Sequence, residues 1–545
     1  MRVGERLNDG LSTGAMPLSG SRKLRRAVLS RTTIDVLLIA VISFVAETTH
    51  FSYKQGRALI CGDSAQYVAS AEALLSPNKT PHFEMRKPGY ILYLAGVSLA
   101  FGNMGWAAVT GHHFFMGLLP LAAYALGRHL RSRWVGWLAA ILTIARLQSV
   151  VWGERMMSET LFTCLFSFGL VLFLVALSRT GPRRWMVGAG LLLGMAWLTR
   201  GAALPIIAVG VVAILVAMAR DWRKALASCA SFVTPVLFCM VLECSLNLAY
   251  AGQFRPSNST AGATLLLRAR HFDGLDLPDT HEAAQVFALL PERSREQAYI
   301  ASHLDVWVAR YHAVHDLGMD EWEYDELMRR VGWDALAGNL RSYVKSSLQV
   351  TLCHLFRQPD GQGLSPVPED RRTGPLIHPA APGDVDWDTT WFAYYGLPHM
   401  TLLESVGLVD RMKTAAAQRA PVGRARVWKA FRYWKTKPAA ERPLAGLTWL
   451  ATLWPGVALL GCPLFGLNRK TCAVLVAAYL LDALFIGFLT PTNVRLQFIW
   501  IVIDTSLAAG AAIGVLHVVV RAAGWLAKRF SDPRPRPRHP AAAFK

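Results

Sequence analysis

Long apolar runs alternate with short polar segments along the chain. Ten runs reach or approach the roughly 20 residues that an α-helix needs to cross a bilayer. These runs cover residues 32–50, 105–127, 134–151, 158–177, 185–199, 202–219, 225–249, 443–465, 471–489 and 496–520. An eleventh run, 88–102, is apolar but short, so we expect a juxtamembrane or re-entrant helix there. The pattern predicts an all-α membrane bundle of about ten transmembrane helices.

The composition agrees with a membrane protein and argues against a nucleic-acid partner. Of 545 residues, 53% are hydrophobic and 17% are charged, whereas soluble proteins carry about 25% charged residues. The net charge of +20 is concentrated in short segments between the apolar runs, as the positive-inside rule requires. We therefore expect membrane lipids, and no nucleic acid, as partners of the basic surface.

The basic clusters orient the chain in the membrane. A cytoplasmic N-terminus places these residues on the inner side: Arg22, Lys23, Arg25, Arg26, Arg31, Arg128, Arg131, Arg133, Arg179, Arg183, Arg184, Arg220, Arg223, Lys224, Arg469 and Lys470. The opposite orientation would place all of them outside, against the rule. If 88–102 crossed the membrane, every later segment would change sides.

This orientation divides the chain into five parts. They are a cytoplasmic basic N-terminus (1–31), a transmembrane core (32–250) with a first outer loop (51–104), a large extracytoplasmic loop (251–442), C-terminal membrane helices (443–520) and a basic cytoplasmic tail (521–545). The large loop is rich in charge and turn residues, so we expect a mixed soluble subdomain on the outer face. Within it, apolar residues at three- to four-residue spacing predict an amphipathic helix against the bundle or the membrane surface; they are Leu340, Val344, Leu348, Leu352 and Leu355.

The stretch "GDSAQYVASAEAL" (62–74) places a carboxylate in the first outer loop. Asp63 and Tyr67 are four residues apart, so they share one face if the alanine-rich stretch is helical. An alternative is that Asp63 caps the helix, because Gly-Asp-Ser is a common start signal. Its role therefore depends on which other charged residues reach the same membrane face.

Several other charges fall on the predicted outer side. Glu154 and Glu159 flank "RMMS", and Arg200 stands alone between two spans, where positive charge is normally scarce. Arg495 opens the last span, and the first outer loop adds Glu84, Arg86 and Lys87 in "FEMRKPGY". Single charges of this kind are often interfacial, but acids and cations on one face from four separate segments indicate a site.

Such a set suits transfer of a sugar from a lipid phosphate to a hydroxyl. The acceptor proton needs a base, and the charge that grows on the departing phosphate needs cations. Phosphate is a good leaving group, so a separate general acid is not essential. A donor with a long polyprenyl tail would lie between the spans with its head group at the outer surface.

The order of motifs resembles the GT-C superfamily of polytopic glycosyltransferases, which includes protein mannosyltransferases and the lipid A aminoarabinose transferase. The matching elements are "GDSAQYVASAEAL", "EMRKPGYILYLAG", "MMSETLF" and "WLTRGAALP", and they cover roughly residues 30 to 250. The resemblance implies a helical membrane fold, a polyprenyl-phosphate-linked sugar donor and a lipid, glycan or protein acceptor. It also implies a location in the plasma membrane with the active site facing outward.

The resemblance also assigns roles residue by residue. Asp63 would be the catalytic base and Glu159 a second acid. Lys87, Arg200 and Arg495 would contact the donor phosphate. The substrate contacts would be Tyr67, Glu84 and Glu154.

Three departures from the family pattern are visible. Ser64 stands where some members have a second acid, which disfavours a two-carboxylate metal site. We assign no cofactor from the sequence and leave a divalent metal open. Gly89 replaces the second proline of a Lys-Pro-Pro element, and the last span begins "RLQFIW" rather than Arg-Tyr.

Two other functions are open from the sequence. Glu243, Asp482 and Asp504 lie in predicted spans, where carboxylates often mark a proton-coupled transporter. A polysaccharide polymerase or ligase would also combine many spans with a large outer loop and its basic residues; these are Arg310, Arg341, His354 and Arg357. The motif order favours the glycosyltransferase.

Overall fold

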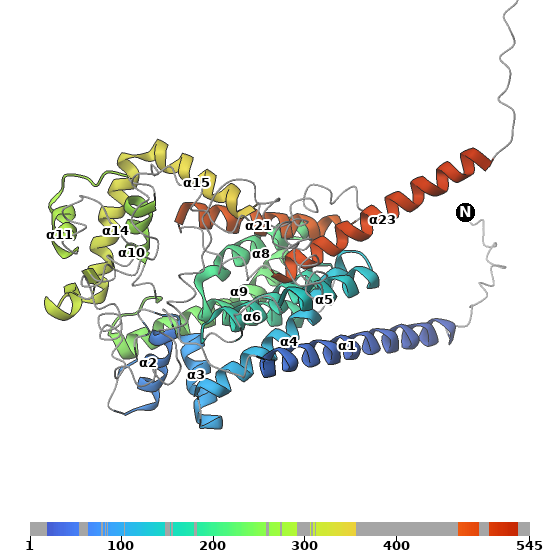
Figure 1. The fold of residues 1–545 in the computed structure, drawn as a ribbon, viewed down its shortest axis with the longest axis horizontal. Coiled ribbons are helices and arrows are strands. Elements are labelled where there is room, and N and C mark those ends of the chain that lie inside the picture. Colours follow the sequence, from blue (N-terminus) through green and yellow to red (C-terminus); the bar gives the residue numbers. More distant parts are fainter. Residues whose placement is uncertain are drawn as a thin grey trace, which may run out of the picture.

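In the computed structural model, the described residues form helices joined by turns and irregular segments (Figure 1). The described residues are 19–53, 64–77, 80–81, 83, 86–102, 104–147, 153, 156–178, 183–257, 261–272, 275–290, 306, 309–310, 312–355, 467–489 and 501–531. No strand occurs among them. This confirms the predicted all-α class for that part of the chain.

Nine of the ten predicted spans fall on helices. These are α1 (Ser19–Tyr53), α4 (Met104–Leu130), α5 (Arg133–Leu147), α6 (Glu159–Ser178), α7 (Arg183–Thr199), α8 (Leu204–Ala217), α9 (Trp222–Ala251), α21 (Arg469–Leu489) and α23 (Ile501–Ser531). The tenth, 443–465, lies outside the described residues. Within those residues, four helices are long and apolar enough to cross a membrane by themselves: α1, α6, α9 and α23. The short run 88–102 forms α3 (Pro88–Phe101).

Helix α6 lies at the centre of the bundle, and other helices surround it. Its aromatic residues Phe162, Phe166 and Phe173 are fully buried, whereas α1 and α9 keep most of their apolar residues exposed. Leu37 and Phe238 illustrate this, with 59% and 64% of their surface exposed. An exposed apolar face of this extent is stable when lipid covers it, so the outer helices are built to contact the bilayer.

A buried ion pair joins α1 to α5. Both oxygens of Asp35 accept hydrogen bonds from Arg133, each at 2.6 Å, and Tyr124 of α4 donates a third bond at 2.7 Å. Asp35 is only 1% exposed. Three bonds to one carboxylate satisfy the buried charge, so this cluster ties three helices together at one end of the bundle.

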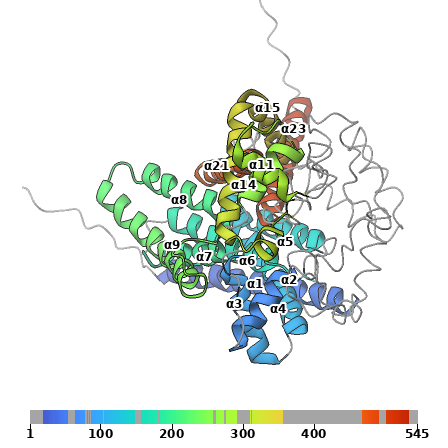
Figure 2. The same ribbon diagram turned by 90° about the vertical axis from the view of Figure 1, so that its left-hand side faces the viewer.

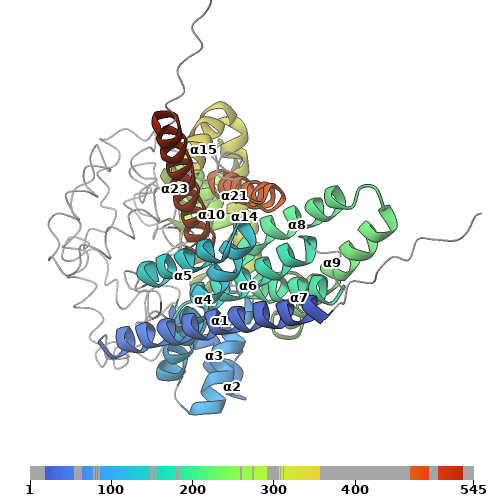
Figure 3. The same ribbon diagram turned by 90° about the vertical axis from the view of Figure 1, so that its right-hand side faces the viewer.

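Both ends of the described chain lie toward the same end of the bundle. The start of α1 and the end of α23 lie there, on the right in Figure 1. Helix α2 (Ser64–Leu75) and the helices α10 (Ala261–Leu266), α11 (His281–Leu289) and α14 (Glu321–Gly338) lie toward the other end. Figures 2 and 3, which view the molecule from opposite sides, show α8 and α9 projecting to one flank. The division into inner and outer parts stays a prediction.

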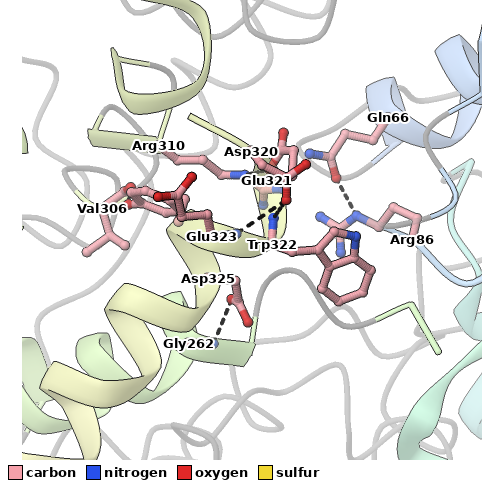
Figure 4. A network of polar contacts seen from close by, with 11 residues as sticks. Gln66, Arg86, Gly262, Val306, Arg310, Asp320, Glu321, Trp322, Glu323 and Asp325 are labelled. Atoms are coloured by element: carbon pink, nitrogen blue, oxygen red, sulfur yellow. Dashed lines mark hydrogen bonds and ion pairs between the residues drawn. The ribbon is translucent and has the colours of Figure 1, made fainter. Parts of the chain in front are cut away.

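The described part of segment 251–442 forms a small helical unit. It contains α10 (Ala261–Leu266), α11 (His281–Leu289), α14 (Glu321–Gly338) and α15 (Leu340–Leu355), with short π-helical turns at Leu267–Phe272 and His312–Asp316. Asp325 of α14 accepts a hydrogen bond from the Gly262 amide at 2.7 Å (Figure 4). The Asp320 carboxylate caps α14 by accepting a bond from the Trp322 amide at 2.8 Å.

Helix α15 confirms the predicted helix but packs through a different face. It lies against α21 of the bundle (Figure 1). Its buried side chains include Tyr343, Ser346 and Ser347, whereas Leu340 and Leu348 of the predicted apolar stripe are exposed. The reason is that both protein and lipid accept an apolar face, so the position of the stripe does not say which of them it contacts.

Candidate functional site

Four of the eight predicted site residues lie in the described part of the chain. Tyr67 belongs to α2, Lys87 directly precedes α3, Glu159 begins α6, and Arg200 directly follows α7. The other four lie outside the described residues; they are Asp63, Glu84, Glu154 and Arg495. In the sequence, Asp63 immediately precedes α2 and stands four residues before Tyr67.

Ser158 connects three of these four elements. The Tyr67 hydroxyl donates to Ser158 Oγ at 3.2 Å, and Arg200 Nη1 donates to the same oxygen at 3.3 Å. Ser158 is fully buried and directly precedes Glu159. Segments that are separated by more than 40 residues in sequence therefore meet at the hydroxyl of Ser158, which is not among the predicted site residues.

Arg200 and Glu159 form an ion pair. Arg200 Nη1 lies 2.8 Å from Glu159 Oε1, and their side chains are 22% and 1% exposed. Within the described residues, neither oxygen of Glu159 accepts a hydrogen bond of regular geometry. Charge attraction to Arg200 and the positive end of the α6 dipole therefore stabilise this buried carboxylate. Arg200 remains the more accessible partner.

Lys87 is held by residues of α7 and α9. Its Nζ donates to both oxygens of Glu243, at 2.6 and 2.9 Å, and lies 3.8 Å from the centre of the Trp197 ring. Burial lowers the pKa of the Lys87 ammonium below its usual value, and the charge of Glu243 opposes this lowering. Only 12% of the Lys87 side chain is exposed. The Lys87 side chain also lies close to the turn that follows Arg200. Its Cε atom is 3.9 Å from the position that a Cβ would take at Gly201.

Gly89 explains one departure from the family pattern. A Cβ at this position would lie 2.8 Å from the backbone carbon and oxygen of Leu198, closer than such atoms approach. The start of α3 therefore packs directly on the last turn of α7, next to Arg200. The absence of a side chain at residue 89 therefore lets the start of α3, which Lys87 precedes, pack against the end of α7, which Arg200 follows.

We expect Gly89→Ala to lower stability by about 1–3 kcal/mol, because the inserted methyl forces α3 away from α7. Gly96→Ala is the matched control in the same helix, since a Cβ there would meet nothing within 4 Å. That change should leave stability equal or raise it by up to about 1 kcal/mol. Melting temperatures of the two purified variants test this, and equal values for both would contradict the close packing.

Two histidines of α4 form hydrogen bonds to neighbouring segments. The Nε2 atom of His112 lies 3.0 Å from the Tyr90 hydroxyl, and its Nδ1 lies 3.2 Å from the Gly153 carbonyl oxygen. His113 Nδ1 lies 3.0 Å from Glu47 Oε2. His112 thus connects α3 to the segment that leads to Glu159, and His113 connects α4 to α1, so both histidines make contacts between elements of the bundle.

Residues that favoured other functions are engaged in ion pairs. Asp504 pairs with Arg146 at 3.1 Å, Glu243 pairs with Lys87, and Arg310 pairs with Glu321. The side chains of His354 and Arg357 lie outside the described residues. Among the described side chains, no group of three or more histidines, cysteines and acids could hold a metal ion.

Comparison with known families matches the segment that carries the site. Residues 86–244 match the model of a family described as dolichyl-phosphate-mannose-protein mannosyltransferase. The match includes Lys87, Glu159, Arg200 and Glu243, and it covers less than a third of the chain. No curated protein matches the chain. With the motif order, the family match supports a polytopic membrane glycosyltransferase of the GT-C type.

Two solved structures resemble the chain at low identity. ArnT from Cupriavidus metallidurans in the apo state is 13% identical, with 93% of this chain and 82% of that chain covered and a TM-score of 0.31. The same protein bound to undecaprenyl phosphate is 14% identical, with 92% and 82% covered and a TM-score of 0.30.

Proposed function

We propose that this protein transfers a sugar from a polyprenyl-phosphate-linked donor to an acceptor hydroxyl at the outer face of the plasma membrane. The observation that carries the proposal is the approach of the Lys87 side chain to the turn that carries a second cation, Arg200. Arg200 is linked through Ser158 to Tyr67 of α2, the helix that Asp63 precedes. The matched family is described by a donor of this class, a dolichyl-phosphate-linked hexose. The sugar would be a hexose or pentose, and the acceptor a lipid, glycan or protein.

The reaction would proceed by direct displacement with inversion. The acceptor oxygen attacks the anomeric carbon while the bond from that carbon to the phosphate oxygen breaks. Asp63 takes the acceptor proton, and the polyprenyl phosphate leaves with the electron pair of the broken bond. Lys87, Arg200 and Arg495 would stabilise the charge that develops on the phosphate.

The remaining predicted residues would shape the substrate site. Tyr67 is fixed through Ser158 to the start of α6, where its ring can border a bound sugar. Glu84 and Glu154 belong to the same predicted outer segments and would hydrogen-bond to sugar or acceptor hydroxyls. Glu159 would hold Arg200 in place through the ion pair at 2.8 Å.

Loss of the protein should cause its donor lipid to accumulate, because the step that consumes it is blocked. Lipid mass spectrometry of cells that lack the protein, with and without a wild-type copy, measures this directly. A polyprenyl-phosphate sugar that rises in the deletion strain and falls on complementation identifies the donor. An unchanged set of polyprenyl-phosphate lipids would refute the proposal and return attention to transport.

A further inference from the structure

Glu243 is a buried acid that the proposed reaction does not use directly. It is fully buried in α9, and its carboxylate accepts four hydrogen bonds. Two come from Lys87, one from Trp197 Nε1 at 2.8 Å and one from the Ser257 amide at 2.8 Å. A carboxylate offers about four acceptor sites, so the described residues already occupy all of them.

Two of these donors fix the Glu243 carboxylate without the help of Lys87. Trp197 belongs to α7, and Ser257 belongs to the segment that follows α9. Asn247 of α9 holds that segment through a bond from its Nδ2 to the Arg255 carbonyl at 2.7 Å. The anion is therefore preorganised, and the flexible lysine side chain adopts the position that the anion defines.

Lys87 keeps capacity for a second anion while it is paired. An ammonium has three N–H groups, and Glu243 takes at most two of them. Within the described residues, no other hydrogen-bond acceptor contacts Nζ. The Trp197 ring covers a further side of the ammonium at 3.8 Å, where a cation–π contact favours the charged form.

We propose that Glu243 is a positioning residue that keeps the Lys87 ammonium charged and aimed at the phosphate of the donor. This inference rests on the proposed function. It adds the residue that allows the buried lysine to bind phosphate as a cation. A neutral amine would neither attract the phosphate nor stabilise the leaving group, and burial favours that neutral form.

The other ionisable groups around Lys87 have partners of their own. Arg86 donates to Gln66 Oε1 (Figure 4), and Arg200 pairs with Glu159. Tyr90 and His112 are bonded to each other. Among the described residues, Cys244, next to Glu243 in α9, is the remaining ionisable neighbour. Within that part of the chain, Glu243 is therefore the acid that can set the charge of Lys87.

The test measures binding of undecaprenyl phosphate to the full-length protein in lipid nanodiscs at pH 7, 8 and 9. Above pH 7 a phosphate monoester is mostly a dianion, because its second pKa is about 6. Changes in affinity over this pH range therefore reflect protonation of the protein and not of the phosphate. Arginine stays protonated at all three values, which provides a rescue variant.

We expect wild-type affinity to change by less than about threefold from pH 7 to pH 9, and that of Glu243→Gln to fall by about tenfold or more. The double variant Glu243→Gln, Lys87→Arg should regain an affinity that does not depend on pH. Asp35→Asn is the matched control, since it removes a buried carboxylate that pairs with an arginine in a separate cluster. It should bind as wild type does at every pH.

Three outcomes would overturn the inference. Equal loss at every pH without rescue by arginine would assign Glu243 to folding alone. Tighter binding at every pH would show that Glu243 competes with the phosphate for Lys87. Unchanged binding would show that Glu243 has no influence. Failure of the proposed function is distinct, because wild type would not bind, or Lys87→Met would bind as tightly as wild type.

Discussion

The Asp63→Asn variant should lose transfer by about 10²- to 10⁴-fold, which is the usual contribution of a general base. Asparagine keeps the size of the side chain and its ability to accept a hydrogen bond, but it cannot take the acceptor proton. The cations that bind the phosphate are unchanged, so affinity for polyprenyl phosphate should stay near that of wild type. The measurement is sugar transfer in membrane vesicles beside binding of the lipid phosphate.

The competing explanation is that Asp63 only caps α2. Asp320 gives the matched control, because its carboxylate caps α14 through bonds to the Trp322 and Glu323 amides at 2.8 and 3.3 Å. Asparagine is nearly as good a cap as aspartate, so Asp320→Asn should leave transfer unchanged. Substantial turnover by Asp63→Asn would place Asp63 in the same class as Asp320.

Sequence periodicity predicted most of the bundle because each membrane helix carries its own signal. An apolar run of sufficient length specifies a helix without reference to its neighbours. Nine predicted spans accordingly fall on helices. The face that α15 buries could not be predicted in this way, because it depends on the fold: Tyr343 packs on Leu265 and Leu336, and Ser346 accepts a bond from Arg268.

The sequence supplies the candidate residues of the site but not the pairs that they form in the structure. Arg200 was visible as an isolated cation and Lys87 as part of the basic pair Arg86-Lys87. Glu243 stands 156 positions from Lys87, and only the packing of α3, α7 and α9 brings them together. From the sequence alone, Glu243 is a carboxylate in a predicted span, a feature that favours a transporter. The sequence did contain one sign of this packing. Gly89 stands where the family pattern has proline, and it lies where α3 approaches α7 closely.

Arg200→Gln should have the second large effect, a loss of about 10²- to 10³-fold in transfer if Arg200 stabilises the departing phosphate. The same change leaves Glu159 buried without its cation, which typically costs about 3–5 kcal/mol of stability. A single variant therefore mixes two effects. The measurement is transfer per folded molecule together with the melting temperature.

The double variant Glu159→Gln, Arg200→Gln separates these effects because it removes both charges of the pair. Stability should return toward that of wild type, since no unpaired ion is left in the buried site. Transfer should stay low, since the donor phosphate still lacks Arg200. Arg133→Gln is the control for destabilisation, because it leaves the buried carboxylate of Asp35 without its cation in a different cluster. This variant should not lower transfer per folded molecule. Recovery of transfer together with stability in the double variant would show that Arg200 serves only to neutralise Glu159, and phosphate recognition would then rest on Lys87.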